Sequence, residues 1–174
     1  MNLVNLMFST ISKNKGFSFI EMIIAIFILI VGIIGVSSAV FKIVFYAPFI
    51  PSRLIAVYLA QEGIEIIRNI RDTNWLEEED WDTGLTFCSV GCEADYKSGT
   101  AEEETPLRSY TGSYLNVDDN NFYSYSAGVS TKYKRQIYIT KLEDDKAQVT
   151  VYINWEEKGK SFLFEAEEYL YNWY

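Results

Sequence analysis

The sequence predicts an α+β fold: a long, kinked N-terminal helix, its first half transmembrane, packed on a C-terminal antiparallel β-sheet. Three observations predict it. Residues 22–41 form a run of 20 residues without a charge. Residues 52–72 carry apolar side chains at helical spacing, and residues 133–170 contain three segments in which apolar and polar residues alternate.

The composition excludes several classes of function. The chain has 174 residues, a net charge of −9 and no histidine. An acidic chain is a poor electrostatic ligand for phosphates, so we expect no direct binding of nucleic acid. The lack of histidine excludes imidazole metal sites and Ser-His or Cys-His catalysis. An enzyme that uses carboxylates alone remains an alternative, but we expect no catalytic residues, no metal site and no cofactor.

The apolar run, residues 22–41, is long enough to cross a membrane. A helix of this length spans about 30 Å, the thickness of the hydrocarbon core of a bilayer. Glu21 lies at the leading edge of the run, although a charge at the centre of a membrane helix costs about 2.5–3.5 kcal/mol and less near the interface. Two simpler interpretations are a plain anchor with an incidental Glu, and a signal peptide cleaved near Ser37-Ser38-Ala39. A signal peptide has a shorter apolar region, of about 7–15 residues.

The residues before the run favour a third interpretation. A leader that ends in Lys15-Gly16 is followed by Phe17, and Glu21 is the fifth residue after Gly16. This pattern resembles the N-terminus of the type IV pilin family, which includes the pseudopilins of type II secretion. The resemblance implies that a prepilin peptidase removes residues 1–16 and methylates Phe17. Residues 17–47 would then form the transmembrane and assembly helix.

The resemblance also implies a partner for the charge of Glu21. Cleavage would create a cationic amine at Phe17, about 6 Å along the same helix. The resemblance implies that Glu21 pairs with the N-terminus of a neighbouring subunit. The implied partners are therefore the peptidase, other pilin subunits through the N-terminal helix, and the membrane. The protein would lie in the cytoplasmic membrane with its head outside the cytoplasm, and in a cell-surface pilus after assembly.

Residues 48–174 are predicted to form the globular head. Two prolines in residues 47–51 predict a kink, and Ser52 is the expected N-cap of a helix over 52–72. Glu65–Arg68 and Arg68–Asp72 are expected ion pairs on its polar face. The apolar face that should pack on the head comprises Ala56, Leu59, Ala60, Gly63, Ile66, Ile67 and Ile70.

Residues 73–121 show no periodicity and are expected to form an irregular loop. They contain both cysteines, Cys88 and Cys92, which would form a disulfide if the head lies in an oxidising compartment. Asp118-Asp119-Asn120-Asn121 lacks the alternating ligand spacing of an EF-hand, so we expect a solvated turn rather than a calcium loop.

Residues 122–174 are expected to form the antiparallel sheet. Its clearest strands are residues 133–142, 146–155 and 160–170, joined by short polar turns. One face should be wet and the other should lie on the second half of the long helix. Trp173 is expected to plug the core.

Two looser resemblances concern the role of the protein. LAQEGIEIIRNIRDTNW, residues 59–75, and the closing YLYNWY resemble the minor pilins called type IV pilus modification proteins. This resemblance implies a minor subunit that primes or tips a pilus. The alternatives are a major pilin, a type II secretion pseudopilin, and a membrane-anchored binding module that does not polymerise.

Overall fold

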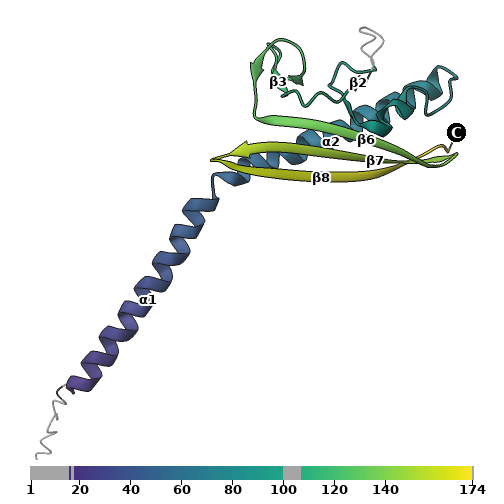
Figure 1. Ribbon diagram of the computed structural model, residues 1–174. Helices are drawn as coiled ribbons and strands as arrows, with labels where there is room; N and C mark the ends of the chain where they lie inside the picture. The colour runs from purple at the N-terminus through teal and green to yellow at the C-terminus, as the bar shows by residue number, and fades with distance from the viewer. Residues whose placement is uncertain (1–15, 17, 100–106, 174) are drawn as a thin grey trace, which may run out of the picture. The chain divides into compact units, whose positions relative to one another are not determined.

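The computed structural model describes residues 16, 18–99 and 107–173. The chain divides into two compact units between Ala47 and Pro48. The first contains the helix α1 (Phe19–Tyr46) and the second is the head (Figure 1). The head contains α2 (Phe49–Leu76), a 3-10 helix η1 (Leu85–Val90), β1 (Cys92–Glu93), β2 (Arg108–Ser109), β3 (Asn116–Val117), β4 (Tyr123–Ser124), β5 (Val129–Ser130), β6 (Tyr133–Glu143), β7 (Lys146–Glu157) and β8 (Lys160–Tyr171).

α1 is one uninterrupted helix of 28 residues. Its interior has no proline, and its last backbone bond runs from the Ala47 N–H to the Ile43 carbonyl at 2.8 Å. The next residue, Pro48, has no N–H to donate to the carbonyl four residues earlier. The helix therefore ends at Tyr46 for a reason that is visible in the sequence.

α2 begins earlier than the sequence suggested. It starts at Phe49 with Pro48 at the N-cap, so Ser52 is not the cap. Pro51 is accommodated because the N–H groups of the first turn have no partner within a helix, and its missing donor costs nothing there. Ser52 is buried instead: its hydroxyl accepts a hydrogen bond from Lys132 Nζ at 2.7 Å, and its carbonyl accepts one from the Tyr133 hydroxyl at 3.1 Å.

The predicted apolar face of α2 is the face that packs on the sheet. Its members are buried, except Ile70, which is partly buried. One of the two predicted ion pairs forms, between Arg68 and Glu65. The second does not, because Arg68 reaches across to Glu168 on β8 and Asp72 pairs with Arg71 at 2.7 Å.

β6, β7 and β8 form the predicted antiparallel meander (Figure 1). β1 and β2 extend it to five strands in the order β2-β1-β6-β7-β8. The β7–β8 connection is the two-residue turn Lys158-Gly159, in which both residues have positive φ, 50° and 71°. Such turns match the twist of the flanking strands, and glycine suits the second position because it has no Cβ. Alternate side chains of β6 and β7 are buried against α2, including Ile137, Val151 and Ile153.

The region expected to be irregular contains short elements. α2 continues to Leu76, and η1, β1, β2 and β3 follow before residue 121. A second small sheet has the order β4-β3-β5. Each of these strands has two residues, which is too short for an alternating pattern to show in the sequence. Asp118 lies in a turn: one carboxylate oxygen accepts the N–H groups of Asn120 and Phe122, and the other accepts the Tyr96 hydroxyl.

Arg135 joins the layers of the head. It is on the inner face of β6 and fully buried. Its guanidinium donates to the Leu59 carbonyl of α2 at 3.1 Å and to the Ala94 carbonyl at 2.5 Å, and it pairs with Glu62 at 3.2 Å. Gly63 makes this approach possible, since a Cβ there would lie 3.1 Å from Arg135 Cδ.

Trp173 does not plug the core. It is 69% exposed. Its ring covers the Arg71 guanidinium at 4.4 Å, and Trp75 covers the same guanidinium at 4.5 Å. Arg71 supplies a cation that attracts both rings, so Trp173 is held at the surface of the head rather than inside it.

Candidate functional site

The residues singled out at the N-terminus lead into α1. Gly16 is exposed, and Ser18 is the N-cap of the helix with extended backbone angles. The leader residues 1–15 and Phe17 lie outside the described residues, so the predicted cleavage bond is represented only by its Gly16 side. The first helical bond, from the Met22 N–H to the Ser18 carbonyl at 3.1 Å, fixes where the helix begins.

Glu21 lies in the first turn of α1. The free N–H groups at a helix N-terminus carry partial positive charge, so a carboxylate in the first turn is stabilised there. Glu21 is exposed, and its carboxylate makes no hydrogen bond or ion pair with any described residue. The carboxylate is therefore placed at the start of the helix with room for a cationic partner.

The surface of α1 is apolar on all sides. None of its residues is buried, and Glu21 and Lys42 are its two charged residues. They are 21 positions apart, about 31 Å along a helix, close to the thickness of the hydrocarbon core of a bilayer. α1 is long and apolar enough to cross a membrane. The two charges mark the two ends of that span.

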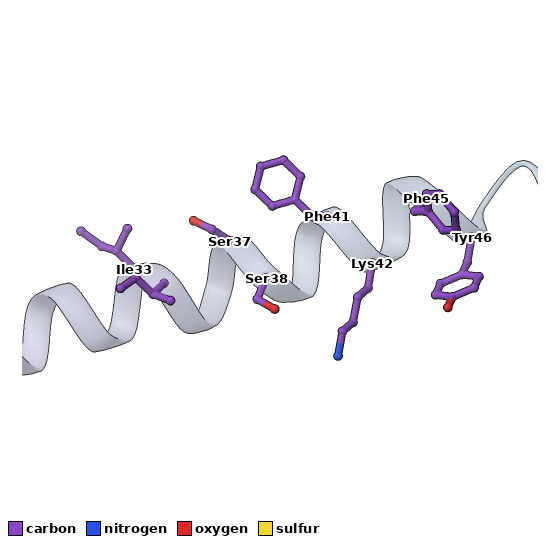
Figure 2. Close-up of a pocket in the computed structure, with 8 residues that line it drawn as sticks. Ile33, Ser37, Ser38, Phe41, Lys42, Phe45 and Tyr46 are labelled. Atoms are coloured by element: carbon purple, nitrogen blue, oxygen red, sulfur yellow. The ribbon is translucent and has the colours of Figure 1, made fainter.

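The C-terminal half of α1 carries its polar side chains close to Lys42. Figure 2 shows Ser38, Lys42 and Tyr46, four residues apart, projecting to one side, and Ser37 and Phe41 to the other. The hollow of about 620 Å³ between these side chains is lined by one helix alone. A long lysine here can extend its amine toward water while its methylene groups stay in apolar surroundings.

Gly32 and Gly35 lie in the middle of α1 without breaking it. A Cβ at either position would meet nothing within 4 Å among the described atoms. Small residues in membrane helices allow another helix to approach closely. If these glycines serve close packing, the partner is a helix from outside this chain's described structure.

The two cysteines are joined. Cys88 in η1 and Cys92 in β1 form a disulfide with Cα atoms 4.9 Å apart, and both are fully buried. The bridge closes the turn at Gly91, whose φ of +94° few other residues adopt. It constrains one local turn in the head. Among the described residues no group of three or more acidic or cysteine side chains is arranged to hold a metal ion.

Together these features define a class. An exposed apolar N-terminal helix with a carboxylate in its first turn, joined to a head in which an antiparallel sheet covers a second helix, is an α+β, type IV pilin-like fold. Comparison with known families matches residues 11–37 to the prokaryotic N-terminal methylation motif. No curated protein and no solved structure matches the chain.

The family match identifies the N-terminal segment. It supports a type IV pilin-like prepilin, and it implies processing by a peptidase and anchoring in a membrane by the N-terminal helix. Gly16, Phe17 and Glu21 all lie within the matched residues. Lys42 lies outside the matched residues, and the sequence analysis gave it no role. Its spacing of 21 positions from Glu21 could have indicated that it lies at the other end of the span.

Proposed function

We propose that the protein is a minor type IV prepilin. A prepilin peptidase cuts between Gly16 and Phe17 and methylates the new amine, and α1 then carries the subunit into a pilus or a related filament, whose assembly it primes. The methylation motif supports the processing steps. The minor role rests on the resemblance of residues 59–75 and 169–174 to type IV pilus modification proteins. We further propose that the protein is not an enzyme.

The position of Glu21 carries this proposal. Its carboxylate is exposed in the first turn of an otherwise apolar helix end and has no partner among the described residues. In hydrocarbon or in a packed helix bundle, an unpaired carboxylate is costly, whereas a close cation restores much of that cost. The amine that cleavage creates at Phe17 of a neighbouring subunit is such a cation. A subunit docked one turn out of register would leave both charges unpaired.

The proposed topology places the head outside the cytoplasm. The peptidase acts on the cytoplasmic side, so residues 1–16 would remain there while α1 crosses the membrane. Disulfides persist outside the cytoplasm, and the Cys88–Cys92 bridge is consistent with that side. After assembly the head would lie on the surface of the filament.

The first test is the mature N-terminus. The full chain is expressed with and without a prepilin peptidase, and the N-terminal peptide is identified by mass spectrometry. We expect methylated Phe17 with the peptidase and an intact leader without it. A chain that keeps Met1 in the presence of a peptidase active on another prepilin, or that begins near Val40, refutes the proposal.

The second test separates anchoring from assembly. Glu21→Ala should insert into the membrane as well as the wild type or better, but its share in sheared filaments should fall at least tenfold. Lys42→Ala removes the other charge of α1 and is the matched control, for which we expect normal incorporation. Normal incorporation of Glu21→Ala would leave the carboxylate without a function in assembly. The amount of the protein per filament then distinguishes a minor subunit from a major one.

A further inference from the structure

A polar pocket of about 570 Å³ opens on the head, and none of the residues that the filament role uses lines it. Its wall is built from β1, β2, β3 and β5, the β2–β3 connection and Tyr125, which follows β4. Side chains with distinct chemistry line it: Glu93, Arg108, Thr111, Ser113, Tyr114 and Tyr125. The pocket thus combines a carboxylate, a guanidinium, hydroxyls and aromatic rings in one hollow.

Glu93 and Arg108 are cross-strand partners in the β1–β2 register, yet they do not pair with each other. Opposite charges at such positions usually attract. Glu93 is 2% exposed, and its Oε1 accepts the N–H groups of Thr111 and Ser113, each at 3.1 Å. The Thr111 hydroxyl donates to the same carboxylate. The negative charge of Glu93 is therefore compensated by the adjoining loop, and no described carboxylate pairs with the Arg108 guanidinium.

The Arg108 side chain is exposed and lines the pocket. Its guanidinium lies over the Tyr125 ring, 4.5 Å from the centroid. Two hydrogen bonds hold Tyr125 in place. Its side-chain hydroxyl donates to the Arg135 carbonyl at 3.2 Å, and its backbone N–H donates to the Asp95 carboxylate at 2.9 Å. The exposed Arg108 side chain makes no hydrogen bond or ion pair with the described residues. Its planar fork of donors is the geometry that grips a carboxylate in two places.

The other wall suits a sugar ring. Tyr114 lines the pocket and is 47% exposed, and Lys134 Nζ lies 4.5 Å from the centroid of its ring. The hydroxyls of Thr111 and Ser113 lie 2.7 Å apart on the same lining. An exposed aromatic face packs against the C–H face of a sugar, and hydroxyls and the loop bind its hydroxyl groups. One exposed guanidinium beside a carboxylate that already has hydrogen-bond donors favours an anionic ligand.

We propose that this pocket binds an acidic saccharide, a sugar chain that carries carboxylate groups. Arg108 holds a carboxylate of the sugar, Tyr114 stacks on a ring, and the Thr111 and Ser113 hydroxyls bond to its hydroxyl groups. This binding role goes beyond the proposed filament role and does not depend on cleavage at Gly16 or on Glu21. It would give the head a ligand on acidic surface polysaccharides.

The test is binding of tetragalacturonate to the full chain in detergent micelles, measured by isothermal titration calorimetry. The methyl ester of the same tetrasaccharide is the matched neutral probe. We expect saturable binding of the acid and at least tenfold weaker binding of the ester. Arg108→Gln and Tyr114→Ala should each weaken binding of the acid at least tenfold, and Arg108→Lys, which keeps the charge without the fork, should lie between. Arg53→Gln removes an exposed arginine on α2 and is the control, with unchanged affinity.

Other outcomes overturn the proposal. No binding of tetragalacturonate, equal affinity for the ester, or equal loss in Arg53→Gln refutes the acidic saccharide. Competition by inorganic phosphate or by acetyl-tetraalanine at concentrations similar to the saccharide would make the pocket a general anion or peptide site. Arg108 and Tyr114 are exposed, so circular dichroism should show wild-type folding of their variants. If one variant unfolds, the other and the ester decide the result.

Discussion

Arg135 is the residue on which the packing of the head depends most clearly, and Arg135→Met tests that role. Methionine keeps most of the length of the side chain and removes its donors. The variant deprives two carbonyls, Leu59 and Ala94, and the Glu62 carboxylate of their guanidinium partner. The packing of the stem against Gly63 should survive, because Met is flexible and of similar volume.

The expected cost follows from how each partner is left. The Ala94 residue is 1% exposed, and a buried carbonyl that loses its donor costs about 1–3 kcal/mol. The Leu59 carbonyl remains within the helical ladder of α2, and the Glu62 side chain is 31% exposed, so water can solvate its charge. Removing a buried charge recovers desolvation energy, and Arg135 Nε has no partner in any case. We expect a net loss of about 1–3 kcal/mol.

The assay is thermal unfolding of the full chain in detergent, followed by near-ultraviolet circular dichroism of the head. For a unit of this size a loss of 1 kcal/mol lowers Tm by about 4 °C, so Arg135→Met should unfold about 4–12 °C below the wild type. Arg53→Met, at an exposed position, should stay within about 2 °C. A Tm of Arg135→Met equal to or above that of the wild type would show that the buried guanidinium is replaceable by an apolar side chain.

Three further perturbations test other parts of the head. Replacing Cys88 and Cys92 by Ala should cost about 2 kcal/mol on the chain-entropy estimate for so short a loop, read from the urea midpoint, and reduced wild type should match the variant. Trp173→Ala should lower stability by about 0.5–2 kcal/mol through its lost contact with Arg71, seen as a lower Tm. The Tyr96 hydroxyl donates a hydrogen bond to Asp118 and lowers the pKa of that carboxyl from its ordinary 3.8. The resulting stability is present above pH 3.8 and is lost as the pH falls through the lower folded pKa, so Asp118→Asn should be less stable than the wild type at pH 7 and equal to it in strong acid.

The long elements could be predicted because each has a periodic pattern that one packing partner explains. Leu59, Gly63 and Ile67 repeat at the spacing of a helix face, and Val149, Val151 and Ile153 alternate as the inner face of a strand does. The prediction of the meander and of the apolar face of α2 was confirmed for this reason. The predicted start of α2 at Ser52 was wrong because proline has two effects. It breaks the interior of a helix but is tolerated in the first turn, as Pro51 is.

The features that the sequence did not predict depend on contacts between residues far apart in the chain. Arg135 reads as a polar residue in an alternating strand, and only its neighbours in α2 show why it points inward. Trp173 was expected in the core, whereas Arg71, about a hundred residues earlier, holds it at the surface. The pocket around Arg108 could not be predicted from the sequence. The strands in its wall have two residues each, which is too short for an alternating pattern.

The chain separates two kinds of electrostatic interaction, and this separation can be tested. Arg135 is compensated within the head, so its charge contributes to stability before any partner is met. Glu21 has no partner among the described residues, and in the proposed filament its charge is compensated by the processed N-terminus of this or another subunit. Glu21→Ala should therefore leave the Tm of the head unchanged and reduce incorporation into filaments. Arg135→Met should lower that Tm and reduce incorporation only as far as it lowers the folded fraction. A Glu21 variant that unfolds the head would mean that the carboxylate has a structural partner within its own chain.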